Sequence, residues 1–284
     1  MLLETTLTPA PPYSLADCAR LASDATRVYR DGVLTAALEA DGSPALARVW
    51  QRREGSLAVR VEGERPEAAL ERLRFVLAVD DSHGEFVTRF RDDALVGPAI
   101  RRFPGRRPLR TATVTHALLK AVCGQLIQAK AARALEARLV RALAPAHEGL
   151  RLPPGRAAFA ALSPAELGRL GLVARKAGAL VRLSRELDLE RLRAVPSSAA
   201  AARIERERGL GPWSAGMVCL YGLGHFDQGL VGDLGLVKLL SAERGRRVET
   251  EETRELLAPY GRWAGLASVY LLSVAPARKT RLAA

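Results

Sequence analysis

Cysteine is scarce in this sequence, and its few occurrences do not fit a metal site. The 284 residues include three cysteines, Cys18, Cys123 and Cys219, which lie far apart and match no metal-ligand spacing. An iron–sulfur cluster needs more cysteine ligands than this, so none is expected. Cys123 and Cys219 sit in apolar helical segments, where a free cysteine behaves as a small buried hydrophobic residue. We therefore expect reduced thiols.

Long hydrophobic runs are also missing. No uncharged stretch approaches the roughly 18 apolar residues of a membrane span. The first residues carry Glu4 and no basic segment before an apolar core, so a secretory signal is not predicted. Together these features predict a cytoplasmic protein without a membrane partner.

Aromatic residues and lysines are few, whereas arginine is abundant. Aromatic side chains make up 5% of the chain, and 5 of its 43 basic residues are lysines. The formal net charge of +12 is typical of proteins that bind a polyanion such as nucleic acid. Alanine is abundant too, a bias that genome composition by itself produces, so the charge alone does not establish that partner. The 4 histidines share no metal-ligand spacing.

The first hundred residues predict a small α+β domain. Strand-like segments alternate with glycine turns, which indicates an antiparallel sheet; the segments are 33–38, 47–51 and 56–61, and the turns are Asp31-Gly32, Asp41-Gly42 and 53–55. Pro66 opens a helix with one apolar face, and another helix is expected at 85–91.

The remainder of the chain is helical in pattern. Thr115 is expected to cap a helix that ends at Gly124, and the break at 124–128 displays Gln125 and Leu126. Further on, residues 163–166 form a capping box with proline at the first helical position. The predicted fold is mainly α with an N-terminal α+β domain (1–100), a basic proline-rich connector (101–112) and a helical domain (113–284).

The most informative motif is the segment Arg208–Gly216, which reads RGLGPWSAG. Gly209 and Gly211 flank one apolar residue, so the turn tolerates a positive φ and a close ligand. Pro212 then suits the first position of a helix. The free amides of such a hairpin and helix start bind an anion, and phosphate is the natural one. An ordinary connection between two packed helices is the alternative.

A lone carboxylate, Asp233, follows at the start of the next helix, within the segment Gly232–Leu236. A simple N-cap explains it equally well structurally. The functional interpretation uses the same geometry, because a helix N-terminus favours an ionised carboxylate that can stabilise an oxocarbenium-like sugar or deprotonate a water. Asp227 is the rival. Asp233 is preferred because a glycine precedes it and a regular helix follows.

Two tryptophans and one leucine complete the candidate site. Trp213 and Trp263 are unusual in a chain so poor in aromatics, and a flipped base needs aromatic faces to stack on. Leu126, at the helix break, is suited to fill the hole that a flipped base leaves in the duplex. For all three residues, a place in the hydrophobic core is the competing interpretation.

These residues resemble the helix-hairpin-helix DNA glycosylase superfamily, and most closely its alkylbase branch, the bacterial 3-methyladenine DNA glycosylase II family. Over about residues 110–275 the shared segments are 121–126, 170–172, 175–177, 209–215, 232–236 and 262–263 with Ala267. The resemblance implies a DNA-repair hydrolase that flips alkylated purines out of duplex DNA and hydrolyses their N-glycosidic bond. A catalytically inactive protein that binds damaged DNA is the alternative. No cofactor is expected to be required, and a monomer is expected.

The resemblance also assigns roles. It implies Asp233 as the catalytic carboxylate, Trp263, Trp213 and Met217 as the base pocket, Leu126 with Gln125 as the wedge, and Gly209, Gly211 and Ser214 as phosphate-binding residues. It further implies a structural Na⁺ or K⁺ held by the main-chain carbonyls of Glu205, Glu207 and Leu210.

Three departures qualify this assignment. Met217 replaces a frequent pocket aromatic, and Glu207 occupies a usually apolar hairpin position, where its charge opposes phosphate binding. Bifunctional relatives carry a Schiff-base lysine at the position of Trp213, so no lyase activity is expected.

Overall fold

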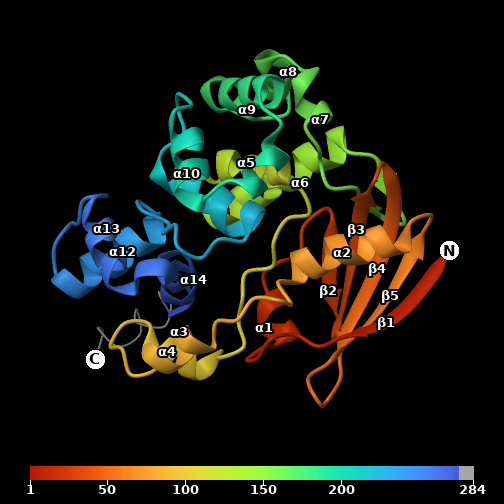
Figure 1. The fold of residues 1–284 in the computed structure, drawn as a ribbon. Helices are drawn as coiled ribbons and strands as arrows, with labels where there is room; N and C mark the ends of the chain where they lie inside the picture. Colours follow the sequence, from red (N-terminus) through yellow and green to blue (C-terminus); the bar gives the residue numbers. More distant parts are fainter. Residues whose placement is uncertain (275–284) are drawn as a thin grey trace.

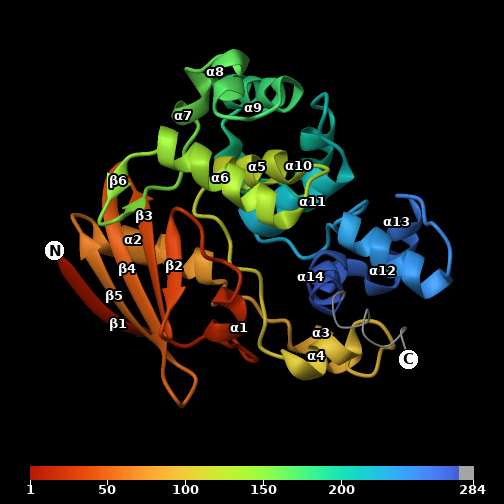
Figure 2. The same cartoon turned by 180° about the vertical axis from the view of Figure 1, so that it is seen from behind.

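The computed structural model describes residues 1–274, which pack around three hydrophobic clusters. Figure 1 shows the corresponding lobes: a sheet with α1 and α2, a group of helices from α5 to α11, and a third group made of α3, α4 and α12 to α14. Figure 2 shows the same three lobes from behind. The protein is thus mainly α with an N-terminal antiparallel sheet, as the sequence predicts. No helix of residues 1–274 is long and apolar enough to cross a membrane.

The sheet has five antiparallel strands in the order β1-β5-β4-β3-β2. Asp31-Gly32 and Asp41-Gly42 both have positive φ, as a tight hairpin turn between right-twisted strands requires. Helix α2 covers one face, beginning at Pro66 and burying Leu73 and Leu77 against the strands. The elements are β1 (Leu2–Leu7), α1 (Leu15–Ala19), β2 (Arg27–Arg30), β3 (Val33–Ala40), β4 (Ser43–Gln51), β5 (Leu57–Gly63) and α2 (Pro66–Leu77).

The second lobe carries the helices around the predicted hairpin. Thr113, rather than Thr115, caps α5, because its side chain accepts from the His116 N–H (3.1 Å) while Thr115 is buried inside the helix. The capping box at Ser163 and Glu166 is confirmed. The elements are α5 (Val114–Gly124), α6 (Ala129–Leu143), β6 (Ala146–His147), β7 (Leu150–Arg151), α7 (Ala157–Ala160), α8 (Pro164–Arg169), α9 (Ala174–Glu186), the 3-10 helix η1 (Leu189–Ala194), α10 (Ser197–Glu205), α11 (Pro212–Val218) and the π-helix η2 (Cys219–Leu223).

The third lobe joins segments from both ends of the chain. Phe86 of α3 packs against Trp263 and Tyr270, so α3 and α4 belong to the C-terminal cluster. The predicted division at residue 100 therefore does not coincide with the packing, because the apolar faces of these two short helices meet the C-terminal helices instead of the sheet. The elements are α3 (Gly84–Arg89), α4 (Gly97–Arg102), α12 (Leu234–Arg244), α13 (Glu252–Leu257), the 3-10 helix η3 (Ala258–Trp263) and α14 (Ala264–Val274).

A buried histidine links the lobes and makes stability depend on pH. His83 is fully buried, its Nδ1 accepts from Arg107 Nε (3.0 Å), and its Nε2 lies 3.0 Å from the Pro104 carbonyl, so the ring is held neutral. Burial, followed by the Arg107 charge, lowers its pKa from 6.5 to about 4. Between these values the unfolded chain binds a proton that the folded protein does not, so stability falls as the pH falls.

We therefore expect acidification from pH 7 to pH 5 to lower the free energy of unfolding by about 2 kcal/mol through this residue alone. His83→Gln removes the titrating ring, so its stability does not carry this pH dependence. The wild type's advantage in free energy of unfolding, measured by chemical denaturation, should therefore shrink as the pH falls. A difference that stays constant from pH 7 to pH 5 would contradict the assignment of a neutral His83.

Candidate active site

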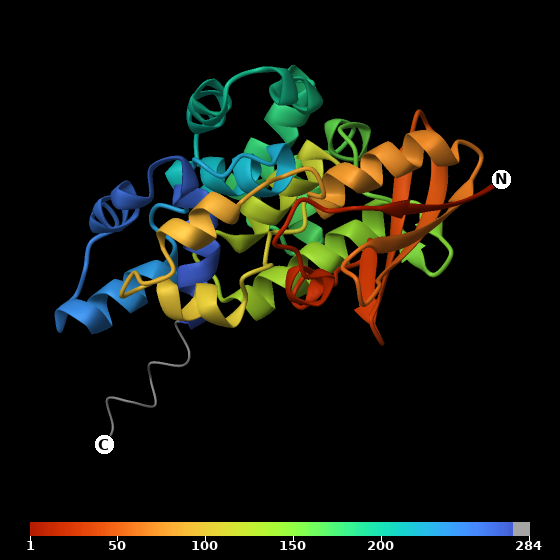
Figure 3. The ribbon, with the colours of Figure 1, turned by 60° about the horizontal axis from the view of Figure 1, so that its bottom comes forward.

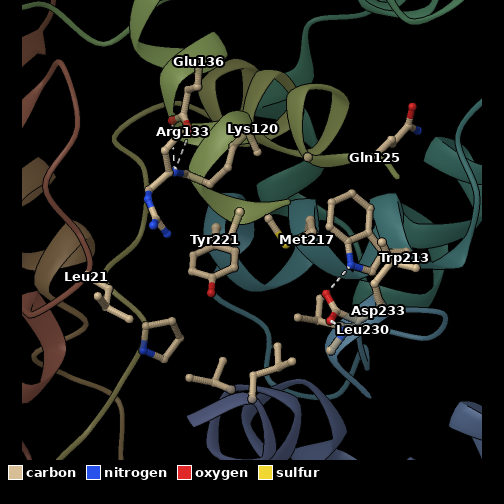
Figure 4. A pocket seen from close by; sticks show the side chains of 18 of the residues that line it. Leu21, Lys120, Gln125, Arg133, Glu136, Trp213, Met217, Tyr221, Leu230 and Asp233 are labelled. Carbon is tan, nitrogen blue, oxygen red and sulfur yellow. Dashed lines mark hydrogen bonds and ion pairs between the residues drawn. The ribbon is translucent and has the colours of Figure 1, made fainter. Parts of the chain in front are cut away.

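One large cavity lies where the three lobes meet. Its volume is about 1170 Å³, and it is lined from α1, the α5–α6 loop, the hairpin, α11, α12 and α14. Figure 4 shows its interior. Eight of the predicted site residues line it: Gln125, Leu126, Gly209, Gly211, Trp213, Ser214, Met217 and Asp233. A volume of this size exceeds what one small ligand usually fills, so there is room for a nucleoside and its flanks.

Asp233 is held rigidly at the cavity wall. It is the N-cap of α12, and its Oδ1 accepts from the Gly235 N–H at 2.7 Å. Its Oδ2 accepts from Trp213 Nε1 at 2.8 Å, an interaction visible in Figure 4. Both oxygens thus have donors with fixed positions, which is how a preorganised charge is built. Asp233 is half-buried and remains accessible from the cavity.

The rival carboxylate lies elsewhere. Asp227 is hydrogen-bonded to the Ser197 hydroxyl at the start of α10, and Gln228 Nε2 lies 3.3 Å from the same oxygen. It does not line the cavity. Asp233 is therefore the aspartate that faces the space a substrate would enter.

Trp213 reaches Asp233 because its indole ring packs directly against Gly124, the last residue of α5. A Cβ built on Gly124 would come within 2.7 Å of the indole ring, so any larger residue would displace the tryptophan. The glycine that ends α5 thereby positions the donor to the carboxylate.

The hairpin is formed as predicted and is connected to the loop that carries Leu126. Gly209 has φ +98°, a conformation that favours glycine. Gln125 Nε2 donates to the Gly209 carbonyl (2.8 Å) and lies 3.0 Å from Ser214 Oγ. Gln125 is thus a brace between the loop and the hairpin, and its amide nitrogen is already occupied.

Leu126 has the exposure that the wedge interpretation requires. It is 85% exposed, with φ +59° in the break between α5 and α6. Lys176 Nζ donates to the Gln125 carbonyl at 2.6 Å and holds the backbone of this loop from α9. A large apolar side chain kept in solvent on a braced loop is not a core leucine, the alternative left open by the sequence.

The unusual Glu207 is neutralised within the protein. It is buried, and Arg182 Nε donates to its Oε1 at 2.8 Å, so its charge does not face a phosphate unopposed. Its main-chain carbonyl accepts from the Leu210 N–H (3.0 Å), which closes the hairpin turn. A carbonyl oxygen has two lone pairs, so this bond still leaves it able to be a cation ligand. The Na⁺ or K⁺ at Glu205, Glu207 and Leu210 stays a prediction.

Trp263 does not occupy the place that the resemblance implies. It is 8% exposed and packs between Phe86 (centroids 6.0 Å apart) and Phe226 (5.9 Å), outside the cavity lining. The cause is a tertiary contact: the Phe86 ring of α3 packs against the indole ring and buries it. The α14 residues that reach the cavity are Val269, Leu272 and Ser273.

Tyr221 is a cavity residue that our sequence reasoning missed. Its ring points into the centre of the cavity in Figure 4, and burial raises its pKa. Trp213, Met217 and Tyr221 follow one another at intervals of four, so helical periodicity could have placed all three on one face. The π-helix η2, a feature frequent at functional sites, carries Tyr221.

A buried charge network lies beyond Tyr221. The ligand atoms of Asp24, His116 and Glu136 lie within 4.8 Å of one another, a spacing that would suit a metal ion. However, Lys120 Nζ lies 3.0 Å from Glu136, and Arg27 Nε lies 3.5 Å from Asp24. Burial acts to raise the pKa of Asp24, but these cations and the Thr26 hydroxyl lower it to about 2. The carboxylates are thus already compensated by side chains.

Known proteins are similar to this chain in sequence and in fold. The DNA-3-methyladenine glycosylase of Bacillus subtilis (strain 168) is 26% identical over 208 residues, which is 69% of this chain and 68% of the relative. A solved 3-methyladenine DNA-glycosylase from Archaeoglobus fulgidus superposes with a TM-score of 0.78 at 25% identity, covering 96% of this chain and 97% of that one. In sequence and in fold the chain is thus similar to the 3-methyladenine glycosylases of the helix-hairpin-helix DNA glycosylase superfamily.

The glycosylase fold extends to more distant neighbours. The 8-oxoguanine glycosylase/lyase of Clostridium acetobutylicum, solved with double-stranded DNA, has a TM-score of 0.75 at 16% identity and covers 99% of this chain and 98% of its own. At this identity the likeness shows the fold alone. No family model matches the chain.

Proposed function

We propose that this protein is a monofunctional DNA glycosylase of the 3-methyladenine type, which hydrolyses the N-glycosidic bond of alkylated purines in duplex DNA. The observation that carries the proposal is the placement of Asp233. A half-buried carboxylate, held by Trp213 and by the Gly235 amide, opens into the cavity that also contains the hairpin and Leu126.

Each part of the cavity then has a role in base release. Leu126 fills the gap that the alkylated nucleotide leaves in the duplex when it rotates into the cavity. The hairpin amides hold the phosphate backbone that flanks this nucleotide. Trp213, Met217 and Tyr221 offer polarisable faces on which a cationic base stacks. Hydrogen bonds from Asn, Gln or the backbone to the edge of a particular base are not needed, since charge and stacking select the lesion.

The chemical step requires one carboxylate. Alkylation at N3 or N7 makes the purine cationic, so when the C1′–N bond breaks, its electron pair goes to the base, which leaves neutral. The positive charge moves to the sugar, where ionised Asp233 stabilises it. A water then adds its oxygen to C1′ and gives up a proton to Asp233 or to solvent. The products are a free base and an intact abasic site.

Chromatography of the material released from methylated DNA tests the function. We expect free methylated purines, absent when the protein is left out. Binding without release of any base would instead support the catalytically inactive alternative, and this outcome would overturn the proposal.

The absence of a lyase step is tested separately. Trp213 has no amine for attack on C1′, and of the lysines that line the cavity Lys176 and Lys120 are engaged with Gln125 and Glu136. Borohydride added during the reaction is therefore expected to trap no protein–DNA adduct, and strand breaks should follow only after alkali.

Lys238, on α12, is the lining lysine to examine if an adduct does form. A trapped adduct that disappears in Lys238→Gln would show bifunctional chemistry. Lys130 does not line the cavity, and Lys279 lies outside the described residues.

A further inference from the structure

The arginines at the end of α4 and in the basic connector after it lie in two different environments. Arg107 is buried and donates to the carbonyls of Ala78 (2.6 Å) and Pro12 (3.0 Å), so it serves the fold. Arg110 is also buried and forms an ion pair with Asp81. Arg102 and Arg106 differ, because they are not buried and turn toward the cavity instead.

These two arginines meet a third, from the end of α1, around one aromatic ring. The guanidinium carbons of Arg20, Arg102 and Arg106 lie 5.8, 5.0 and 5.5 Å from the centroid of the Phe103 ring. Any two of these carbons are thus at most about 11 Å apart. Within residues 1–274, none of the three forms an ion pair with a carboxylate. We call Arg20, Arg102, Phe103 and Arg106 the arginine cluster.

The backbone under the arginine cluster is rigid. Tyr270 Oη lies 2.9 Å from the Phe103 carbonyl and 3.0 Å from the Arg106 carbonyl. The Ser14 amide donates to the Gly105 carbonyl (2.9 Å), which ties the connector to the start of α1. The Arg106 guanidinium itself donates to Ser273 Oγ. Three like charges are therefore gathered on a fixed frame, although mutual repulsion opposes their approach.

An anion would relieve that repulsion, and the position of the arginine cluster identifies which kind. All four members line the cavity that contains Asp233 and the hairpin. In Figures 1 and 2, α1 and α4 lie across the centre of the molecule from α10 and α11, and Figure 3 shows the same separation from below. Guanidinium groups match phosphate oxygens in geometry and charge.

We propose that Arg20, Arg102 and Arg106 bind a backbone phosphate of duplex DNA on the wall of the cavity opposite the hairpin. The DNA would then be held on both sides of Asp233, by hairpin amides on one wall and by guanidinium groups on the other. The sheet lobe, through α1, becomes part of the DNA interface. This inference rests on the proposed function only in taking DNA as the polyanion.

The salt dependence of binding tests the proposal. The binding constant for an undamaged duplex is measured over a range of salt concentrations for the wild type, Arg20→Gln, Arg102→Gln, Arg106→Gln and the triple variant. Loss of one phosphate contact reduces the slope of log K against log salt by about 0.9. Because the three arginines share one phosphate, the triple variant is expected to lose about 0.9 from the slope, with affinity reduced ~3- to 10-fold for each arginine.

The controls separate a lost contact from lost structure or lost net charge. Arg53→Gln removes an exposed arginine of the β4–β5 turn that does not line the cavity, and its slope should stay at the wild-type value. Arg102→Lys and Arg106→Lys keep the charge and should retain the slope. Thermal unfolding of the triple variant should match the wild type, because two of the three side chains are exposed and the third is half-buried.

A wild-type slope in the triple variant would overturn the phosphate site. Base release from methylated DNA is scored independently. Normal release with an unchanged slope would leave the proposed function standing without the arginine cluster. No release with a reduced slope would support the phosphate site while overturning the glycosylase proposal.

Discussion

Replacing Asp233 with asparagine is expected to lower the rate of base release by about 100- to 10,000-fold, while affinity for duplex DNA stays the same or rises. The neutral amide cannot stabilise the positive sugar, and removing a negative charge from the cavity favours the approach of phosphates. Asparagine is a good N-cap, so its oxygen can still accept from the Gly235 N–H. The Trp213 N–H then loses its acceptor.

Single-turnover release of methylated purines is the measurement, with duplex affinity recorded in parallel. Asp227→Asn is the matched control, because that carboxylate contacts Ser197 and Gln228 and does not line the cavity. Trp213→Phe removes the donor alone and is expected to have a smaller effect than the loss of the charge. Near wild-type turnover in Asp233→Asn together with an inactive Asp227→Asn would show that the wrong aspartate has been chosen.

Valine at position 211 is expected to weaken binding to duplex DNA by ~10- to 100-fold, equally for damaged and undamaged DNA, because phosphate contacts carry no sequence information. Gly211 has extended backbone (φ −127°, ψ −171°), and a Cβ added there meets no atom within 4 Å. The folded protein therefore accepts the valine, whose methyl groups occupy the space in front of the hairpin amides where a phosphate would sit.

Gly209→Val provides a comparison within the same turn. Gly209 has φ +98°, so this variant should bind DNA weakly and also be less stable, by about 1–3 kcal/mol. Fluorescence anisotropy with matched damaged and undamaged duplexes measures the binding, and chemical denaturation measures the stability. If Gly211→Val lost affinity only for lesion-bearing DNA, the hairpin would read the lesion and not the phosphate backbone.

Local chemistry accounts for the parts of this protein that could be predicted from sequence. Asp31-Gly32 and Asp41-Gly42 set their turns because few other residues accept positive φ. The capping box at Ser163 likewise starts α8 through its own hydrogen bonds. In the site, glycine before Asp233 and a regular helix after it were sufficient to place the aspartate at the N-cap of α12.

Contacts between distant segments decided the rest. The sequence alone does not distinguish Trp263 from Trp213. In the structure, α3 buries Trp263 in an aromatic cluster, whereas the small Gly124 leaves room for Trp213 to reach Asp233. The brace from Gln125 to Gly209 joins residues 84 positions apart.

The same division holds for charge. Arg106 and Arg107 are neighbours in the sequence, and nothing local distinguishes them. Arg107 is buried, and its guanidinium donates to the carbonyls of Ala78 and Pro12, which are distant in the sequence. Arg106 joins Arg20 over Phe103 because α1 packs beside the connector. The sequence by itself determined the glycine turns, the capping box at Ser163 and the hairpin with its aspartate, since these depend on adjacent residues. Only the tertiary structure decided which aromatic faces the cavity and which arginines remain available to an anion, since burial depends on what packs against each side chain.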